Sequence, residues 1–247
     1  MPLVSRGGPR PLACPRSVGC SIYSARPELH DALTRLPGSL EKSLRSIRLL
    51  RDAGVPVIIK TALTRAAAPH WRELADLAHG MGCSLPFDLG ITAQNDGRLA
   101  PLAQRVTDEV IVDEIFSSRY YDLSYSGEQA ARMTRPHEFA GLCGAGAGSL
   151  AVGPTGEIRP CIALNVVLGS IRERRLGDIW GDSPFLREFE AIRAVDVEFR
   201  RECADFAMCS RCPGAWLAEG GSYLRPTEHA CFLGHALARA QRRRLTS

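Results

Sequence analysis

Two cysteine-containing stretches decide the fold of the C-terminal part of this chain: CGAGAGSLAVGPTGEIRPC (143–161) and CADFAMCSRC (203–212). In the first, the turn residues 153–156 separate two short segments, 149–152 and 157–161, which predicts a β-hairpin with a cysteine on either side. In the second, five and then two residues separate the cysteines, and a further cysteine follows at position 231. Thiolates placed in this way on turns and helix starts can point toward shared centres, so the pattern is typical of sites for soft metal ions.

The whole chain has the composition of an ordinary globular protein. It has 247 residues, 45% hydrophobic and 23% charged, which is enough for one large domain or two modest ones. The net charge is only +4 and the arginines are spread out, apart from the tail at 239–244, so no nucleic-acid partner is expected. No apolar run has the length of a membrane span or of a signal-peptide core, so we expect a cytoplasmic protein without a membrane partner. In the cytoplasm, clustered cysteines favour metals over disulfides.

The N-terminal half alternates between strand-like and helix-like segments. Residues 1–19 read as an irregular leader that is rich in proline, glycine and arginine. After it, strands alternate with helices that end at glycines, which is typical of parallel βα units. The predicted elements are a strand at 20–24, a loop or short helix at 26–36, a helix from an N-cap at Ser39 to Gly54, a strand at 55–63, a helix from Pro69 to Gly82 and a strand at 84–92.

Three parallel strands are too few for a closed barrel, so this α/β unit looks like part of a larger one. Thr107 is expected to cap a helix over 108–116, and the polar segment that follows is expected to be a linker. Further on, 176–193 is expected to be helical, and Thr227 to cap a last helix that carries Cys231.

The cysteine pattern resembles a known domain. The Cys-Gly-Ala-Gly opening at 143–146, the Pro-Thr-Gly-Glu-Ile-Arg-Pro-Cys hairpin at 154–161 and the Cys-Ser-Arg-Cys-Pro-Gly segment at 209–214 resemble the SPASM domain. That domain holds the auxiliary clusters of radical S-adenosylmethionine (radical SAM) enzymes that modify ribosomally made peptides. Residues 21–54, 57–61 and 85–92 look like the fourth to sixth units of the radical SAM barrel. The resemblance covers roughly 20–235, and it is nearest to the pyrroloquinoline-quinone-type peptide maturases.

This resemblance implies a fold, cofactors and ligands. The fold would be a partial radical SAM-type α/β barrel followed by a small cysteine-rich SPASM domain, and the cofactors one or two auxiliary [4Fe-4S] clusters. The family pattern has a further cysteine where Arg200 stands here, so the second cluster would have only three thiolates, and the first would also have three matched ligands. The ligands implied are Cys143, Cys161 and Cys212 for the first cluster, and Cys203, Cys209 and Cys231 for the second.

Structural zinc is the alternative metal for these six cysteines, because zinc also prefers four thiolates and would use the same loops. Spacing alone does not separate the two metals, whereas the resemblance favours iron and sulfide. Either metal should contribute strongly to folding this end of the chain, which has few large apolar residues between its cysteines. Cys14, Cys20 and Cys83 are expected to be ordinary free or buried cysteines.

The sequence departs from the radical SAM family at its start. It holds no Cys-x3-Cys-x2-Cys loop, and Cys14 and Cys20 have the wrong spacing for one. We therefore expect an N-terminally truncated member, from a coding sequence that is frameshifted or begins late. The resemblance assigns S-adenosylmethionine contacts to Ser21, Lys60 and Thr61, which otherwise read as ordinary polar residues at strand ends.

Three other residues in the same half invite a functional reading. His30 and Asp31 are expected to be a loop hydrogen-bonding pair rather than an acid–base pair. For Asp88, a substrate-facing and a structural role are equally compatible with its place between two apolar residues.

The sequence therefore predicts an iron–sulfur protein that resembles radical SAM/SPASM peptide maturases but does not start radical chemistry alone. Its partner would be a precursor peptide or a peptide-recognition protein. The alternative is a non-catalytic module, degenerate or stabilised by zinc, that binds a precursor peptide or a full-length partner. The predicted domains are the leader 1–19, the partial barrel 20–97, a linker with a helix 98–138, the SPASM domain 139–235 and a basic tail 236–247.

Overall fold

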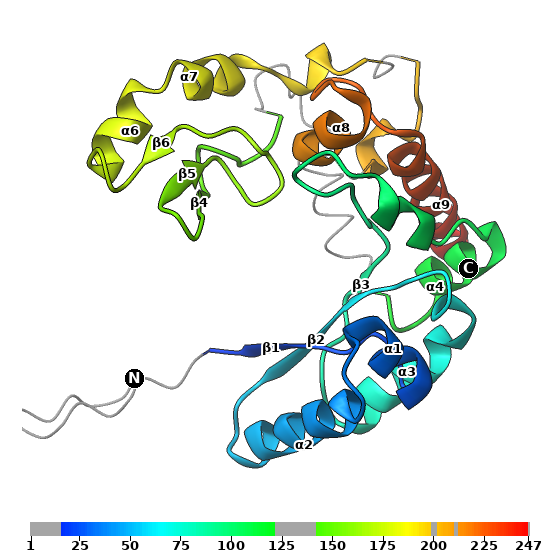
Figure 1. The fold of residues 1–247 in the computed structure, drawn as a ribbon. Helices are drawn as coiled ribbons and strands as arrows, with labels where there is room; N and C mark the ends of the chain where they lie inside the picture. The colour runs from blue at the N-terminus through cyan, green and yellow to red at the C-terminus, as the bar shows by residue number, and fades with distance from the viewer. Residues whose placement is uncertain (1–15, 122–141, 199–201, 210–211, 247) are drawn as a thin grey trace, which may run out of the picture. The chain divides into compact units, whose positions relative to one another are not determined.

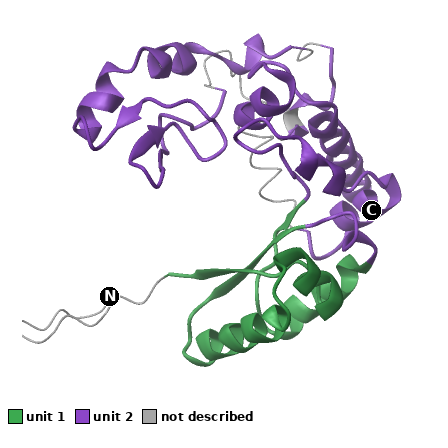
Figure 2. Cartoon of the chain, in the orientation of Figure 1, with its two compact units in different colours: residues 1–62, 70–88 green, residues 63–69, 89–247 purple. Residues whose placement is uncertain are grey.

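The computed structural model describes residues 16–121, 142–198, 202–209 and 212–246 (Figure 1). The chain divides into two compact units, one of residues 1–62 and 70–88 and the other of residues 63–69 and 89–247 (Figure 2). These units are defined by packing, so the domain limits drawn from the sequence motifs stay predictions.

The first unit is built on a parallel sheet with the strand order β1 (Val18–Ser21), β2 (Val57–Ala62), β3 (Phe87–Asp88). Two helices, α1 (Pro27–Thr34) and α2 (Ser39–Asp52), connect the first two strands, and α3 (Trp71–Gly80) precedes the third (Figure 1). The prediction of three parallel strands that alternate with helices is confirmed, but β1 begins at Val18, inside the predicted leader, and ends at Ser21 rather than at residue 24.

The two faces of this sheet differ in burial. Along β2, Ile59 and Thr61 are buried whereas Lys60 between them is exposed, because successive side chains of a strand point to opposite faces. Helix α2 packs on β1 and β2 and buries Ile47 completely. Trp71 at the start of α3 meets the ring of Phe87 edge-on, with 5.9 Å between the ring centroids. The core of this unit therefore lies on the Thr61 side of the sheet.

The start of α2 differs from the prediction that Ser39 is its N-cap. The N-cap is Gly38, in the left-handed region at φ 73°, and Ser39 is the first helical residue. The orphan amides of the helix start bond to Asp31 of α1, whose Oδ2 accepts from Gly38 N at 2.6 Å and Oδ1 from Leu40 N at 3.0 Å. A carboxylate from the preceding helix thus replaces the local cap.

The third strand is much shorter than the predicted strand 84–92. Only Phe87 and Asp88 form the ladder with β2, and Ser84 adds an isolated bridge to Ile58. Pro86 stands between them and has no N–H to donate, which limits the pairing of this segment.

The second unit holds a small antiparallel sheet and a set of helices. The sheet has the order β4 (Ala151–Val152), β5 (Glu157–Arg159), β6 (Gly169–Ser170), so the predicted hairpin is confirmed and extended by a third short strand. None of the described helices is long and apolar enough to cross a membrane. The helices of this unit are α4 (Glu109–Ser117), α6 (Leu176–Asp182), α7 (Pro184–Ala191), α8 (Pro213–Gly220) and α9 (Glu228–Leu245).

Two of these helix limits correct the sequence prediction. The predicted helix 176–193 is two helices, because Ser183 is extended and its Oγ accepts from Leu186 N to begin α7 at Pro184. The cap of α4 is Asp108 rather than Thr107, and its carboxylate accepts from the amides of Val110 and Ile111.

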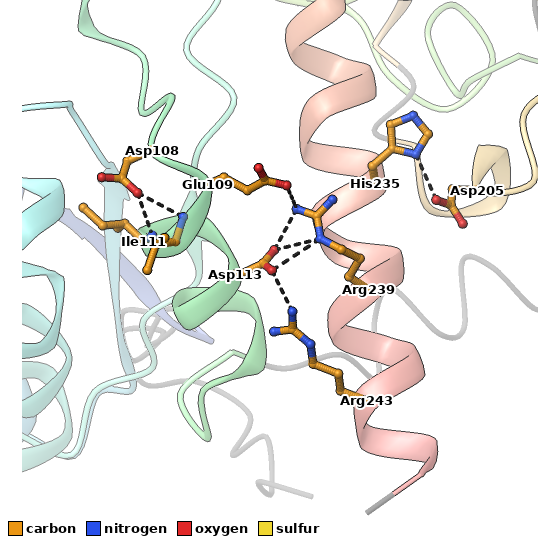
Figure 3. A network of polar contacts seen from close by, with 9 residues as sticks. Asp108, Glu109, Ile111, Asp113, Asp205, His235, Arg239 and Arg243 are labelled. Atoms are coloured by element: carbon orange, nitrogen blue, oxygen red, sulfur yellow. Dashed lines mark hydrogen bonds and ion pairs between the residues drawn. The ribbon is translucent and has the colours of Figure 1, made fainter.

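The cap of α9 is confirmed, because Thr227 Oγ1 accepts from Ala230 N at 3.2 Å. An ion-pair network holds α4 against α9 (Figure 3). Asp113 of α4 accepts from Arg239 at 2.9 Å and from Arg243 at 3.0 Å, and Glu109 also pairs with Arg239 at 2.7 Å. The basic tail of α9 is therefore largely occupied by carboxylates of this same unit.

Candidate metal centres

The first predicted set of cysteines lines one cavity. Cys143, Cys161 and Cys212 all face a space of about 350 Å³. The three come from different parts of the chain, so only the folded second unit brings their sulfurs together. The rest of the lining is small or apolar: Gly144, Ala145, Gly148, Ser149, Leu164, Pro213 and Gly214.

Local structure explains where each of these thiols lies. The hairpin of β4 and β5 closes through Gly156, whose φ of 93° suits glycine, and Cys161 follows the end of β5. Cys212 is the N-cap residue of α8, so its side chain lies at the positive end of the helix dipole. Pro213 at the first helical position needs no hydrogen-bond partner for its nitrogen, which favours a helix start here.

Backbone amides already point at two of the sulfurs. Ala145 N–H donates to Cys143 Sγ at 3.4 Å, and Leu164 N–H donates to Cys161 Sγ at 3.2 Å. Hydrogen bonds to cysteine sulfur are one of the means by which proteins tune iron–sulfur clusters. Together with the helix start at Cys212, they favour negative charge in this cavity.

A close backbone contact fixes the distance between two of these loops. Gly214 of α8 lies so near the segment of Ala163 and Leu164 that an added Cβ would stand 2.5 Å from Ala163 C and 2.7 Å from Leu164 N. No L side chain fits there without a backbone shift, so Gly214 holds the loop of Cys161 near the helix of Cys212.

The second predicted set also faces one cavity, but a much smaller one. Cys203, Cys209 and Cys231 line a space of about 30 Å³, which is room for about one water molecule. The other lining residues include three ionisable side chains: Glu198, Asp205 and His235. The donors for a metal centre are thus gathered here, although a cluster would have to widen the cavity.

Packing and burial set the state of these thiols. Cys209 is buried against α9, where a Cβ on Gly234 would come within 3.1 Å of Cys209 Cα. Burial raises the pKa of the Cys231 thiol, and the nearby Cys203 and Glu228 act in the same direction. The metal-free site therefore favours the protonated thiol of Cys231, and iron or zinc would displace that proton on binding.

All eight cysteines in the described part of the chain are free thiols, and Cys14 lies outside it. Among the same residues, no three His, Cys, Asp or Glu side chains converge closely enough for a single metal ion. The first set instead surrounds a cavity of about 350 Å³, which suits a cluster because its irons spread the ligands apart. Cys20 and Cys83 are half-buried in the first unit, where burial raises the pKa of Cys83.

The three residues expected to contact S-adenosylmethionine do not share one face. Ser21 pairs with Lys60 in the parallel register, and both side chains are exposed. Thr61 points to the opposite, buried face, where its Oγ1 has no hydrogen-bond partner among the described residues. Asp88 lies in register with Ala62 on the exposed face, so it joins Ser21 and Lys60 rather than the core.

His30 and Asp31 lie in α1 rather than in the predicted loop, and both accept hydrogen bonds from backbone amides. His30 is buried, its Nδ1 accepts from Tyr23 N at 3.1 Å, and burial lowers its pKa. The pKa of Asp31 is also lowered, chiefly by the hydrogen bond from Leu40 N.

Sequence reasoning missed two features of the second unit. His235 and Asp205 belong to the second cysteine cavity, and the spacing Cys231-x3-His235 on one helix face could have indicated the histidine. A further cavity of about 630 Å³ is lined by the ion pair of Arg105 with Glu219 and by His229. The pair joins residues far apart in sequence, so no local pattern could have indicated it.

Comparison with known proteins supports the metal-binding interpretation. The iron–sulfur cluster-binding domain named SPASM matches residues 143–213. An AdoMet-dependent heme synthase of Oleidesulfovibrio alaskensis is 26% identical over 232 residues, which cover 83% of this chain and 59% of the relative. The subtilosin biosynthesis protein AlbA of Bacillus subtilis is 26% identical over 84% of this chain and 45% of its own length. A PqqA peptide cyclase of Granulibacter bethesdensis is also 26% identical, over 81% and 56%. The chain thus spans about half of the length of these relatives.

Solved structures show the same fold. Native anSMEcpe with bound AdoMet superposes with a TM-score of 0.66 at 15% identity. The match covers 94% of this chain and 68% of the anSMEcpe chain. Streptococcus suis SuiB bound to S-adenosylmethionine gives 0.51 at 14% identity, over 86% of this chain and 53% of its own. The matched domain, the curated relatives and the shared fold thus make the chain similar to proteins of the radical SAM/SPASM group.

Proposed function

We propose that this chain supplies the auxiliary iron–sulfur part of a radical SAM enzyme that modifies a ribosomally made peptide. The observation that carries the proposal is the grouping of six cysteines into two threes, each around its own cavity. The first set and two cysteines of the second lie inside the matched SPASM domain, and Cys231 lies beyond it.

The residues present fit a cluster best at the first cavity. Cys143, Cys161 and Cys212 would be its ligands, which leaves one iron open to water or to a substrate group. When bound, such a cluster supplies electron transfer. The amides of Ala145 and Leu164 would then stabilise negative charge on the ligand sulfurs.

Catalysis by these residues alone is not proposed. The 247 residues hold no Cys-x3-Cys-x2-Cys loop, which the radical SAM family uses to bind the cluster that cleaves S-adenosylmethionine. Contacts to S-adenosylmethionine are proposed for Ser21 and Lys60 on the exposed face of the sheet. Thr61 would contribute only through the strand that it shares with Lys60.

Peptide is the proposed substrate class, because two of the relatives are named for a bacteriocin and for a peptide cyclase. A solved neighbour, native anSMEcpe, also holds a peptide together with AdoMet. A tetrapyrrole is the second candidate, since three of the curated relatives are heme synthases. Binding of a fluorescent precursor peptide and of an iron-free porphyrin distinguishes the two, and we expect saturable binding of the peptide only.

The metal proposal is tested by anaerobic reconstitution followed by assays of iron, sulfide and zinc. We expect iron and sulfide in equal amounts and a brown protein. Replacing Cys143, Cys161 and Cys212 by serine should remove the iron and sulfide of the first cluster. Replacing Cys83 by serine is the matched control and should leave the iron and sulfide content unchanged. A colourless protein with freely titratable thiols would contradict the proposal, and stoichiometric zinc would favour the alternative of a non-catalytic binding module.

The catalytic part is tested separately. Reconstituted protein is incubated with S-adenosylmethionine and dithionite, and 5′-deoxyadenosine is measured. We expect none, and its formation by these 247 residues would refute the claim that they do not start radical chemistry alone.

A further inference from the structure

The loop that follows Cys161 is held in place by Asn95. Asn95 Nδ2 donates to Ile162 O at 3.0 Å, and Asn165 Nδ2 donates to Asn95 O. Asn95 thus binds the loop through both its side chain and its main chain. The two contacts lie on either side of Leu164, whose N–H donates to Cys161 Sγ at 3.2 Å. They therefore fix the part of the loop that points an amide at the cysteine sulfur.

Asn95 belongs to a turn that is stabilised by its own hydrogen bonds. Gln94 N–H donates to Arg98 O at 3.0 Å, and Gly97 N–H donates to Gln94 O at 2.9 Å. Gly97 has a φ of 83°, which suits glycine. The Asp96 carboxylate also accepts from Arg98 N at 3.1 Å. The turn is thus a well-defined support for the cysteine loop.

The same segment contacts a second element that carries a cysteine of the first set. Arg105 forms an ion pair with Glu219 of α8, and the two side chains are only 11% and 9% exposed. Cys212 is the N-cap residue of this helix. Arg105 Nε also donates to Ile91 O at 2.6 Å, which ties the two ends of the segment 91–105 together. This segment therefore holds α8 as well as the cysteine loop.

We infer that Asn95 is a positioning residue of the first metal centre and that it acts through the loop of Cys161. The inference rests on the proposed function. Hydrogen bonds to the sulfurs are one of the factors that set the potential of an iron–sulfur cluster. An N–H donor stabilises the reduced state more, because that state carries the additional negative charge. Loss of the Asn95 contact should therefore lower the reduction potential of the first cluster and loosen its iron.

The contact itself is tested in the metal-free protein. Asn95→Ala removes the side-chain donor to Ile162 O. Gln94→Ala is the matched control, because the neighbouring Gln94 makes its turn contacts with the main chain. Hydrogen–deuterium exchange of the Leu164 amide should be faster in Asn95→Ala than in the unchanged protein, since the loop opens more readily. Gln94→Ala should leave the rate of exchange unchanged.

The positioning role is tested after anaerobic reconstitution, by redox titration followed by EPR and by iron release to a chelator. The signal that disappears when Cys143, Cys161 and Cys212 are all replaced by serine is that of the first cluster. In Asn95→Ala, this cluster should have a lower midpoint potential and should be held about 10-fold less tightly, as for other outer partners of metal ligands. Gln94→Ala should match the unchanged protein in both measurements.

Asn165→Ala tests the same contact from the side of the loop. It removes the donor to Asn95 O and should shift the potential in the same direction. The double variant should shift the potential by less than the sum of the two single shifts, because both residues hold the same loop. Asn165→Ala also supplies the potential if Asn95→Ala retains too little iron for a titration.

An unchanged potential in these variants overturns the inference, even if their stability falls, because a merely structural contact would change stability alone. An unchanged exchange rate of the Leu164 amide in Asn95→Ala overturns it as well. Failure of the proposed function looks different. In that case the unchanged protein takes up no iron and sulfide, whereas the faster exchange in Asn95→Ala persists.

Discussion

Replacing Gly214 by alanine should disturb the first cavity without touching a cysteine. The new Cβ would stand 2.5 Å from Ala163 C and 2.7 Å from Leu164 N, and both are backbone atoms that cannot rotate away. The loop of residues 163–164 would have to move off α8. This movement would shift the Leu164 amide, which donates to Cys161 Sγ, relative to Cys212 at the helix start.

The size of the effect follows from two opposing terms. Overpacking in a well-packed region costs about 1–3 kcal/mol, and alanine in place of glycine in a helix recovers about 0.5–1 kcal/mol. The free energy of unfolding of the metal-free protein should therefore fall by about 1–2 kcal/mol. For a unit of this size, that fall corresponds to a decrease in Tm of about 2–8 °C.

Gly220, in the last turn of the same helix, supplies the matched control. An added Cβ there meets no atom within 4 Å, so Gly220→Ala should leave the free energy of unfolding unchanged or raise it by up to about 1 kcal/mol. Urea unfolding of the metal-free proteins and iron analysis after reconstitution measure both effects. Gly214→Ala should lose iron of the first cluster as well as stability. If it matches Gly220→Ala in both, the reasoning about this contact is wrong.

Three further changes have definite outcomes. Thr227→Ala removes the cap of α9 and should lower the free energy of unfolding by about 1 kcal/mol in urea, and no change would contradict the capping role. Glu219→Ala leaves Arg105 without its buried partner and should cost about 3–5 kcal/mol, whereas a loss below about 1 kcal/mol would mean that water replaces the carboxylate. Burial lowers the pKa of His30 below its ordinary value of 6.5, so the unfolded chain takes up a proton here more readily than the folded protein. The free energy of unfolding is therefore highest above pH 6.5 and decreases as the pH falls through 6.5 toward the pKa of the folded state. His30→Gln should flatten the decrease of Tm with falling pH, and burial of His229, which lowers its pKa, should leave a residual slope.

The alternation of strands and helices was predictable because each element carries its own local signal. Val57 to Ala62 is β-branched and apolar, and Gly54 and Gly82 both take the positive φ that ends the preceding helix. The limits were less predictable where a distant group decides them. Asp31 satisfies the start of α2 from another helix, so the local signal of Ser39 gave the wrong cap.

From the order of residues alone, most of the elements were predictable, and the resemblance to the SPASM domain predicted how the six cysteines divide into two sets. The tertiary structure alone decided what surrounds them. It put His235 and Asp205 beside the second set, brought Cys212 to the cavity of Cys143 and Cys161, and set Ser21 beside Lys60 through the strand register. These facts depend on which segments pack together and on strand register, and a one-residue change of register moves every side chain to the other face.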